Sequence, residues 1–187
     1  MPPAEGGGMG INMYIHYYNS PLGRITLASD GKSLAGLWFD GQKYFESTLE
    51  GERIQEYSPV FGQAERWLDI YFSGKDPGFT PPLSMEGATP FRKTVWEILL
   101  SIQFGHTMPY GGIADIIAKQ RGTGHMSAQA VGGAVAHNPF SIIVPCHRVI
   151  GSDGKLTGYA GGTDRKKLLL ELEKTGRLMV NSAICKA

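Results

Sequence analysis

The sequence predicts two domains: an α/β domain at the amino terminus and a mainly helical domain after it. Residues 12–39 contain three β-rich runs separated by turn sequences, and residues 60–73 carry apolar side chains at helical spacing. Residues 77–90 are rich in Pro and Gly, as inter-domain connections often are, and helical patterns dominate beyond them. The sequence therefore divides into a flexible tail at 1–10, an α/β domain at 11–76, a linker at 77–88, a helical domain at 89–176 and a tail at 177–187.

The β-rich runs at 12–39 predict a small antiparallel sheet. Turn sequences at 20–23 and 29–32 contain Pro or Asp together with Gly, and such turns join neighbouring strands of a hairpin. The helix at 60–73 follows them and ends at Gly74.

The second domain begins with a helix that starts at Thr89 as N-cap and Pro90 as first residue, and continues to Ile102. Two further helices are predicted at Tyr110–Gln120 and Met126–Ala136. The turn between them, at 121–125, contains two glycines, which is the pattern of a helix-turn-helix but also of many other helical hairpins.

The last part of this domain combines a β-rich run with a final helix. Ser141–Ile150 predicts a strand that is broken by Pro145. Asp164 is placed to cap a helix that ends near Thr175.

Composition excludes several classes of protein. Apolar residues make up 42% of the 187 residues and charged residues 19%, which is ordinary for a globular protein and not for a disordered one. No apolar run reaches the roughly 18 residues of a membrane span, and the amino terminus lacks the basic and apolar regions of a secretory signal. With only two cysteines, one of them Cys185 near the end, we expect a cytoplasmic protein without a disulfide framework.

Charge is divided unevenly between the two halves. Residues 1–90 carry six Lys or Arg against eleven Asp or Glu, whereas residues 91–187 carry twelve against six. A basic half is consistent with an anionic partner, although a chance imbalance explains the charges equally well.

Cys146 is the residue that points most directly to chemistry. A free Cys in an apolar run is most often inert packing, but Pro145 breaks the run, and His147 and Arg148 place cationic groups beside the sulfur. Such neighbours lower a thiol pKa toward neutrality. In an extended strand His147 would point away from Cys146, so either the Pro kinks the chain or a water connects the two side chains.

Six pieces of the sequence, in this order, resemble the O6-alkylguanine-DNA alkyltransferases, also called methylated-DNA–protein-cysteine methyltransferases. They are TPFRKTVWEIL at 89–99, Gly105-His106-Thr107 with Tyr110, AVGGAVAHNP at 130–139, IIVPCHRVIG at 142–151, GYAGG at 158–162 and Leu172-Glu173. The resemblance is close over 89–175 and loose before it. It implies a ribonuclease-H-like α/β domain followed by a helical domain with a winged helix-turn-helix-like DNA-binding motif.

The resemblance also implies roles for individual residues. Cys146 would accept the alkyl group, His147 would draw the thiol proton through a water, and Glu173 would orient His147. Asn138 would brace the turn before the active-site strand, and the Tyr110 hydroxyl would donate to the departing purine. The remaining residues expected at the base or the DNA are Arg148, Gln129, Ala128, Ala130, Gly132, Val149, Tyr159 and Ala160.

The partner implied is double-stranded DNA containing O6-alkylguanine, repaired by a monomer in one irreversible turnover without a cofactor. Sulfur displacement at a saturated carbon needs a thiolate, and the buried target atom requires the base to be turned out of the duplex. Some relatives hold a zinc ion through amino-terminal Cys and His, but this chain has no Cys before 146, so no metal is expected. Many relatives carry Arg where this chain has Gln129, which predicts weaker and less salt-sensitive DNA binding.

Two other functions remain open from the sequence. A non-catalytic sensor of alkylated DNA would use the same helix-turn-helix without alkyl transfer. A cysteine hydrolase would use Cys146 with a His and an oxyanion hole, although adjacent Cys and His on one strand disfavour that geometry.

Overall fold

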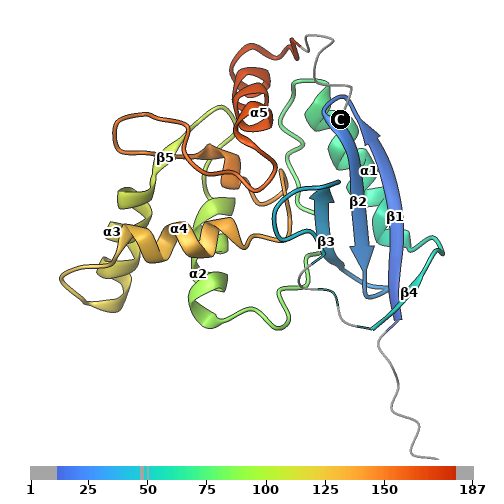
Figure 1. The fold of residues 1–187 in the computed structure, drawn as a ribbon, viewed down its shortest axis with the longest axis horizontal. Helices are drawn as coiled ribbons and strands as arrows, with labels where there is room; N and C mark the ends of the chain where they lie inside the picture. The colour runs from blue at the N-terminus through green and yellow to red at the C-terminus, as the bar shows by residue number, and fades with distance from the viewer. Residues whose placement is uncertain (1–11, 47–48, 50, 180–187) are drawn as a thin grey trace, which may run out of the picture.

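The computed structural model describes residues 12–46, 49 and 51–179, and these form two lobes that lie side by side (Figure 1). The expected tail at 1–10, Cys185 and most of the expected tail at 177–187 lie outside the described residues. In the described ranges no helix is long and apolar enough to cross a membrane.

The sheet lobe contains four strands, β1 (Asn12–Ser20), β2 (Gly23–Ser29), β3 (Leu34–Phe39) and β4 (Glu52–Ile54), in the order β3-β2-β1-β4. The predicted hairpins are confirmed, because β1 pairs antiparallel with β2 and β2 with β3. The fourth strand, β4, was not predicted, and it runs parallel to β1. The chain crosses from the β3 edge to the opposite edge, and a strand of three mostly exposed residues leaves no alternating pattern to detect.

Helix α1 (Pro59–Phe72) packs on the sheet and confirms the helix predicted at 60–73 to within one residue at each end. Its buried face is continuous with the core of the helical lobe, so that one apolar cluster holds both lobes together. The buried residues of α1 are Val60, Phe61, Ala64, Trp67, Leu68 and Tyr71.

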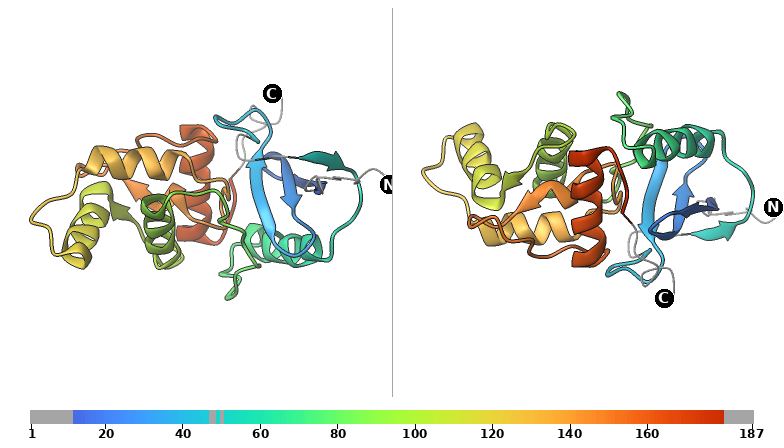
Figure 2. Two further views of the ribbon diagram at one scale, coloured as in Figure 1. Left: turned by 90° about the horizontal axis from the view of Figure 1, so that it is seen from below. Right: turned by 90° about the horizontal axis from the view of Figure 1, so that it is seen from above.

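The helical lobe consists of α2 (Pro90–Leu100), α3 (Tyr110–Arg121), α4 (Ala128–Ala136) and α5 (Thr163–Thr175). Figure 2 shows α5 on the side of this lobe that faces the sheet. The Thr89 cap is confirmed, since its side chain accepts from the N–H of Arg92. Helix α4 begins two residues later than predicted, because Ser127 caps it.

Two expectations for the end of the chain are wrong. Asp164 does not cap α5, which begins at Thr163 directly after Gly162; the Asp164 carboxylate lies in the first turn, where it suits the helix dipole. The run 141–150 is not one strand. Only Val149–Ile150 (β6) is extended, paired in parallel with β5 (Met108–Pro109), and Cys146–Arg148 form a 3₁₀ helix.

A tight turn before Cys146 explains why this run does not extend. Ile142 has a φ of 71°, a left-handed conformation that a β-branched residue rarely adopts. The turn is also tied to the sheet, since Leu37 of β3 donates to the carbonyl of Pro139 and accepts from the N–H of Ser141, each at 2.8 Å. The sheet lobe thus holds the segment that carries the cysteine.

Asn138 braces the same turn from within. Its Oδ1 accepts from the N–H of Phe140 at 2.9 Å, and its Nδ2 lies 2.8 Å from the carbonyl oxygen of Val144 and 3.2 Å from Cys146 Sγ. The side chain is buried, so these partners have no water to replace it.

The ends of α1 and α5 touch through two glycines. Gly74 and Gly176 both have positive φ, 82° and 68°, and a Cβ built on Gly74 would lie 2.2 Å from the carbonyl oxygen of Gly176. No side chain fits at position 74 unless the two helices separate.

We expect Asn138→Ala to lower the free energy of unfolding by about 2–4 kcal/mol, because it leaves the buried N–H of Phe140 without a partner and removes one of the two donors to the Val144 carbonyl in a strained turn. Urea denaturation measures the change. Asn19→Ala, at an exposed position of β1, is the control and should change stability by no more than about 0.5 kcal/mol. Equal losses in the two variants would contradict the bracing role of Asn138.

Candidate active site

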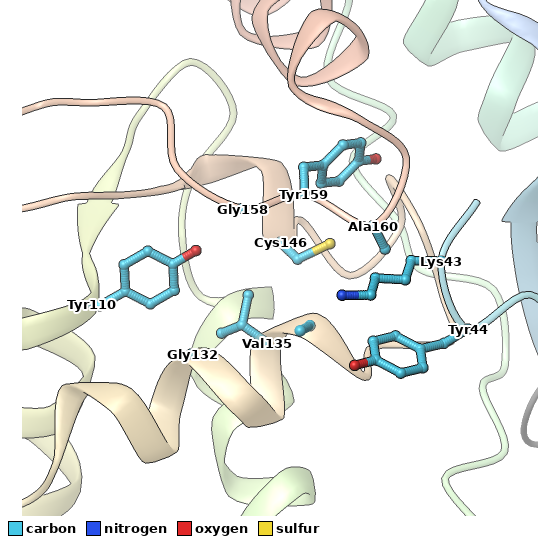
Figure 3. A pocket seen from close by; sticks show the side chains of 10 residues that line it. Lys43, Tyr44, Tyr110, Gly132, Val135, Cys146, Gly158, Tyr159 and Ala160 are labelled. Carbon is cyan, nitrogen blue, oxygen red and sulfur yellow. The ribbon is translucent and has the colours of Figure 1, made fainter.

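A cavity of about 220 Å³ lies between α4, the Cys146 turn and a loop of the sheet lobe. Figure 3 shows the Cys146 sulfur directed into it, with Tyr110 at one end and the Lys43 ammonium at the other. The residues that line it are Lys43, Tyr44, Tyr110, Gly132, Val135, Ala136, Cys146, Gly158, Tyr159 and Ala160.

Cys146 is the nucleophile available to this cavity. Its side chain is only 4% exposed, and burial raises the pKa of the thiol, although the hydrogen bond from Asn138 and the charge of Lys166 act in the opposite direction. The expectation that neighbouring cations bring this pKa toward neutrality is therefore wrong. Since the thiol is protonated at rest, a base must remove its proton during reaction.

The next residue, His147, carries an imidazole that can accept a proton. Its Nε2 lies 2.6 Å from Glu173 Oε1, and burial lowers the imidazole pKa against the opposing effect of Glu173. An ionised carboxylate only accepts hydrogen bonds, so Nε2 carries the proton and Nδ1 holds the free lone pair. Within the described part of the chain, this buried Nδ1 has no hydrogen-bond partner, which leaves it available as an acceptor.

Glu173 is a buried carboxylate surrounded by donors. Burial alone would raise its pKa, but the hydrogen bonds and charges of His147 and Arg148 outweigh it and lower the pKa to about 2. Arg148 donates from Nε to Oε2 at 2.9 Å, Gly105 donates its N–H to Oε2 at 3.0 Å, and the Tyr71 hydroxyl donates to Oε1 at 2.7 Å. Glu173 is therefore ionised throughout the neutral range.

Arg148 does not lie at the cavity where a contact with DNA was expected. Its guanidinium is buried, bound to Glu173 and to the carbonyl of Ile102. The physical reason is the carboxylate: once Glu173 is inside the protein, its charge needs a cation beside it.

The rim of the cavity is held by a second buried cation. Lys166, fully buried, donates from Nζ to the carbonyl oxygens of Val149 at 2.6 Å and Thr157 at 2.8 Å. Tyr110 donates to the same Thr157 carbonyl at 3.3 Å, and burial raises its pKa, so the hydroxyl keeps its proton. Lys166 thus clamps together the segments around 149 and 157 that border the site.

The structure brings together some of the predicted residues and leaves others outside. Cys146, Tyr110, Gly132, Tyr159 and Ala160 line the cavity, Asn138 donates to the sulfur, and His147, the residue after Cys146, is hydrogen-bonded to Glu173. The backbone groups of Val149 are occupied by Cys146 and Lys166, and Val149 does not line the cavity. The first three residues of α4, Ala128, Gln129 and Ala130, are exposed and do not line the cavity.

Sequence reasoning missed the contribution of the sheet lobe. The Lys43 N–H donates to the Ala160 carbonyl at 3.0 Å, and the Tyr44 ring stacks on His137 at the end of α4 with centroids 4.2 Å apart. Tyr44 also has a φ of 60°, a conformation uncommon outside glycine. No local pattern marks these two residues, because their role depends on a loop that reaches the other lobe.

Comparison with known proteins agrees with this geometry. The chain matches two family models, the ribonuclease-like domain of 6-O-methylguanine DNA methyltransferase over residues 13–85 and its DNA binding domain over residues 90–175. It is 45% identical to the methylated-DNA–protein-cysteine methyltransferase of Mycobacterium bovis over 166 residues, which cover 86% of this chain and 93% of that protein. The corresponding protein of Methanosarcina barkeri is also 45% identical, with coverage of 87% and 98%.

Solved structures show the same likeness. The crystal structure of Mycobacterium tuberculosis OGT in complex with DNA has a TM-score of 0.72 at 42% identity and covers 89% of this chain and 95% of that one. The two lobes are accordingly a ribonuclease-like domain and a helical DNA-binding domain, and the chain belongs to the 6-O-methylguanine DNA methyltransferase family.

Proposed function

We propose that this protein repairs DNA directly, by moving the alkyl group of an O6-alkylguanine onto Cys146. The observation that carries the proposal is a thiol directed into a cavity, on the same short 3₁₀ helix as an imidazole that a buried carboxylate orients. The relatives named for this activity and the DNA complex of one of them support it.

The chemistry follows from the protonation states. His147 Nδ1 accepts the thiol proton, directly or through a water, and the imidazolium that results is stabilised by Glu173. The sulfur attacks the alkyl carbon, the bond between that carbon and O6 breaks, and its electron pair leaves with the purine. Tyr110, which keeps its proton, donates to the purine as negative charge develops on it.

The product on the protein is a thioether. Its sulfur–carbon bond has no leaving group that water or a second thiol displaces readily, and no cofactor is needed to form it. Each molecule therefore acts once.

Helices α3 and α4 are proposed as the DNA-binding motif, a helix-turn-helix of the winged type, with α4 in the minor groove. Its exposed residues at 128–130 are small or uncharged, which permits close approach of the helix to sugar and phosphate. Because the target atom lies inside the duplex, the alkylated nucleotide is turned out into the cavity beside Cys146. Gln129 would face the gap that this nucleotide leaves.

Incubation with a duplex oligonucleotide bearing one O6-methylguanine should add one methyl group to the protein. Intact-protein mass spectrometry measures the gain, and peptide mapping should place it on Cys146. Cys146→Ser should gain nothing, while Cys185→Ser, the matched control, should gain the same mass as the natural chain. Binding of the oligonucleotide without a mass gain would identify a sensor instead and refute the proposal.

Gln129→Arg should tighten DNA binding and steepen its salt dependence. One added phosphate contact makes the slope of log K against log salt more negative by about 0.9, which fluorescence anisotropy at several salt concentrations detects. Gln63→Arg adds the same charge on the exposed side of α1, in the other lobe, and should leave the slope unchanged. If both variants give the natural slope, Gln129 does not face the DNA.

A further inference from the structure

We propose that Tyr71, a residue of the sheet lobe, is a positioning residue of the catalytic base, acting through the carboxylate it shares with His147. This inference rests on the proposed function. It concerns a residue whose helix belongs to the ribonuclease-like domain, whereas the sulfur, the imidazole and the carboxylate all belong to the DNA-binding domain.

The geometry places the Tyr71 hydroxyl inside the base. It donates to Glu173 Oε1 at 2.7 Å, and it lies 3.2 Å from His147 Nε2, which uses the same Oε1 at 2.6 Å. Tyr71 is fully buried, and burial followed by the charge of Glu173 raises its pKa well above the usual value. The hydroxyl therefore remains a donor whenever Glu173 is ionised.

The ring of Tyr71 is fixed on three sides. It stacks on Trp67 with centroids 5.2 Å apart, and it meets the edges or faces of Phe104 and His147 at 5.9 Å and 6.2 Å. A buried ring held in this way has little freedom to withdraw its hydroxyl from Oε1. Packing alone would be satisfied by Phe, so the hydroxyl is the part that needs a functional explanation.

Tyr71 and His147 share Glu173 Oε1 with the Arg148 guanidinium, whose Nη2 donates to the same oxygen at 3.1 Å, and each donor takes up part of its negative charge. A hydrogen bond from Tyr71 disperses charge that would otherwise attract the Nε2 proton of His147, and so it keeps the imidazole from becoming too basic. The 2.7 Å bond to Oε1 outweighs the looser 3.2 Å contact with Nε2, which sets the direction of the effect. Tyr71 thus helps to keep His147 neutral and able to accept the thiol proton.

Other groups also act on this pair, and they are unchanged when Tyr71 is altered. They are Arg148 of the 3₁₀ helix, Lys166 of α5 and Tyr159 of the segment before α5.

Tyr71→Phe is the direct test, since it removes one oxygen and retains the ring. Single-turnover alkyl transfer at saturating O6-methylguanine duplex should lose rate as pH falls, because protonated His147 accepts no proton. We call this fall in rate on the acid side of the pH profile the acid limb. Loss of a typical hydrogen bond should move the acid limb to higher pH by about 0.5–1 unit, so that the rate at pH values below it falls about three- to tenfold. Above the limb the rate should match the natural chain.

The matched control is Tyr18→Phe. Tyr18 donates to Asp69 of the same helix at 2.7 Å, so this variant also loses one tyrosine–carboxylate bond on α1, but away from the base. A merely structural contribution would lower the stability of both variants and leave both acid limbs in place. Fluorotyrosine at position 71, a stronger donor of nearly the same shape, should move the acid limb to lower pH.

Nuclear magnetic resonance of the His147 imidazole in DNA-free protein gives a second measurement. Its pKa should rise in Tyr71→Phe, and this measurement does not depend on which step limits the reaction with DNA. A His147 pKa that stays in place or falls in Tyr71→Phe overturns the role assigned to Tyr71. Absence of methyl transfer by the natural chain would overturn the proposed function instead, and the two failures are therefore separate.

Discussion

One buried carboxylate organises the site and joins the two lobes. A charge inside a protein is tolerated only when donors and an opposite charge surround it. Glu173 meets this requirement with a hydroxyl from α1, an imidazole and a guanidinium from the 3₁₀ helix, and a backbone N–H before β5. Because these donors come from three parts of the chain and the carboxylate from a fourth, α5, satisfying the charge also fixes the relative positions of all four. The sulfur stands next to the residues so fixed.

The placement of the sulfur depends on a second, uncharged constraint. Asn138 fills the inside of a turn that holds Ile142 in a left-handed conformation, and β3 secures the turn from outside through Leu37. Strain of this kind persists only where the surroundings determine the conformation completely. The Asn138 side chain that stabilises the turn also donates to Cys146 Sγ. One amide group therefore supports both the backbone of the turn and the thiolate that develops on the sulfur.

Much of this arrangement can be predicted from the sequence. The remainder depends on tertiary contacts, which local sequence patterns do not show. Helix α1 and the hairpins follow from periodicity and turn residues, and the ordered pieces around Cys146 indicate the family. The strand predicted at 141–150 is wrong, because a β-rich composition gives no sign of the turn that Asn138 and Pro145 impose. Arg148 was expected at the DNA and the thiol pKa was expected to fall, and both expectations fail because burial, not sequence neighbourhood, decides the electrostatics. Tyr71 is found as a core residue, but only the tertiary structure shows what its hydroxyl touches.

The glycine contact between α1 and α5 makes the hydrogen bond between Tyr71 and Glu173 depend on the distance between these two helices. Tyr71 and Glu173 lie three residues before Gly74 and Gly176, respectively, so the spacing that these glycines permit is also the spacing between hydroxyl and carboxylate. A single methyl group introduced at position 74 would act as a wedge between the lobes. Two residues without a side chain therefore set the distance at which Tyr71 donates to Glu173.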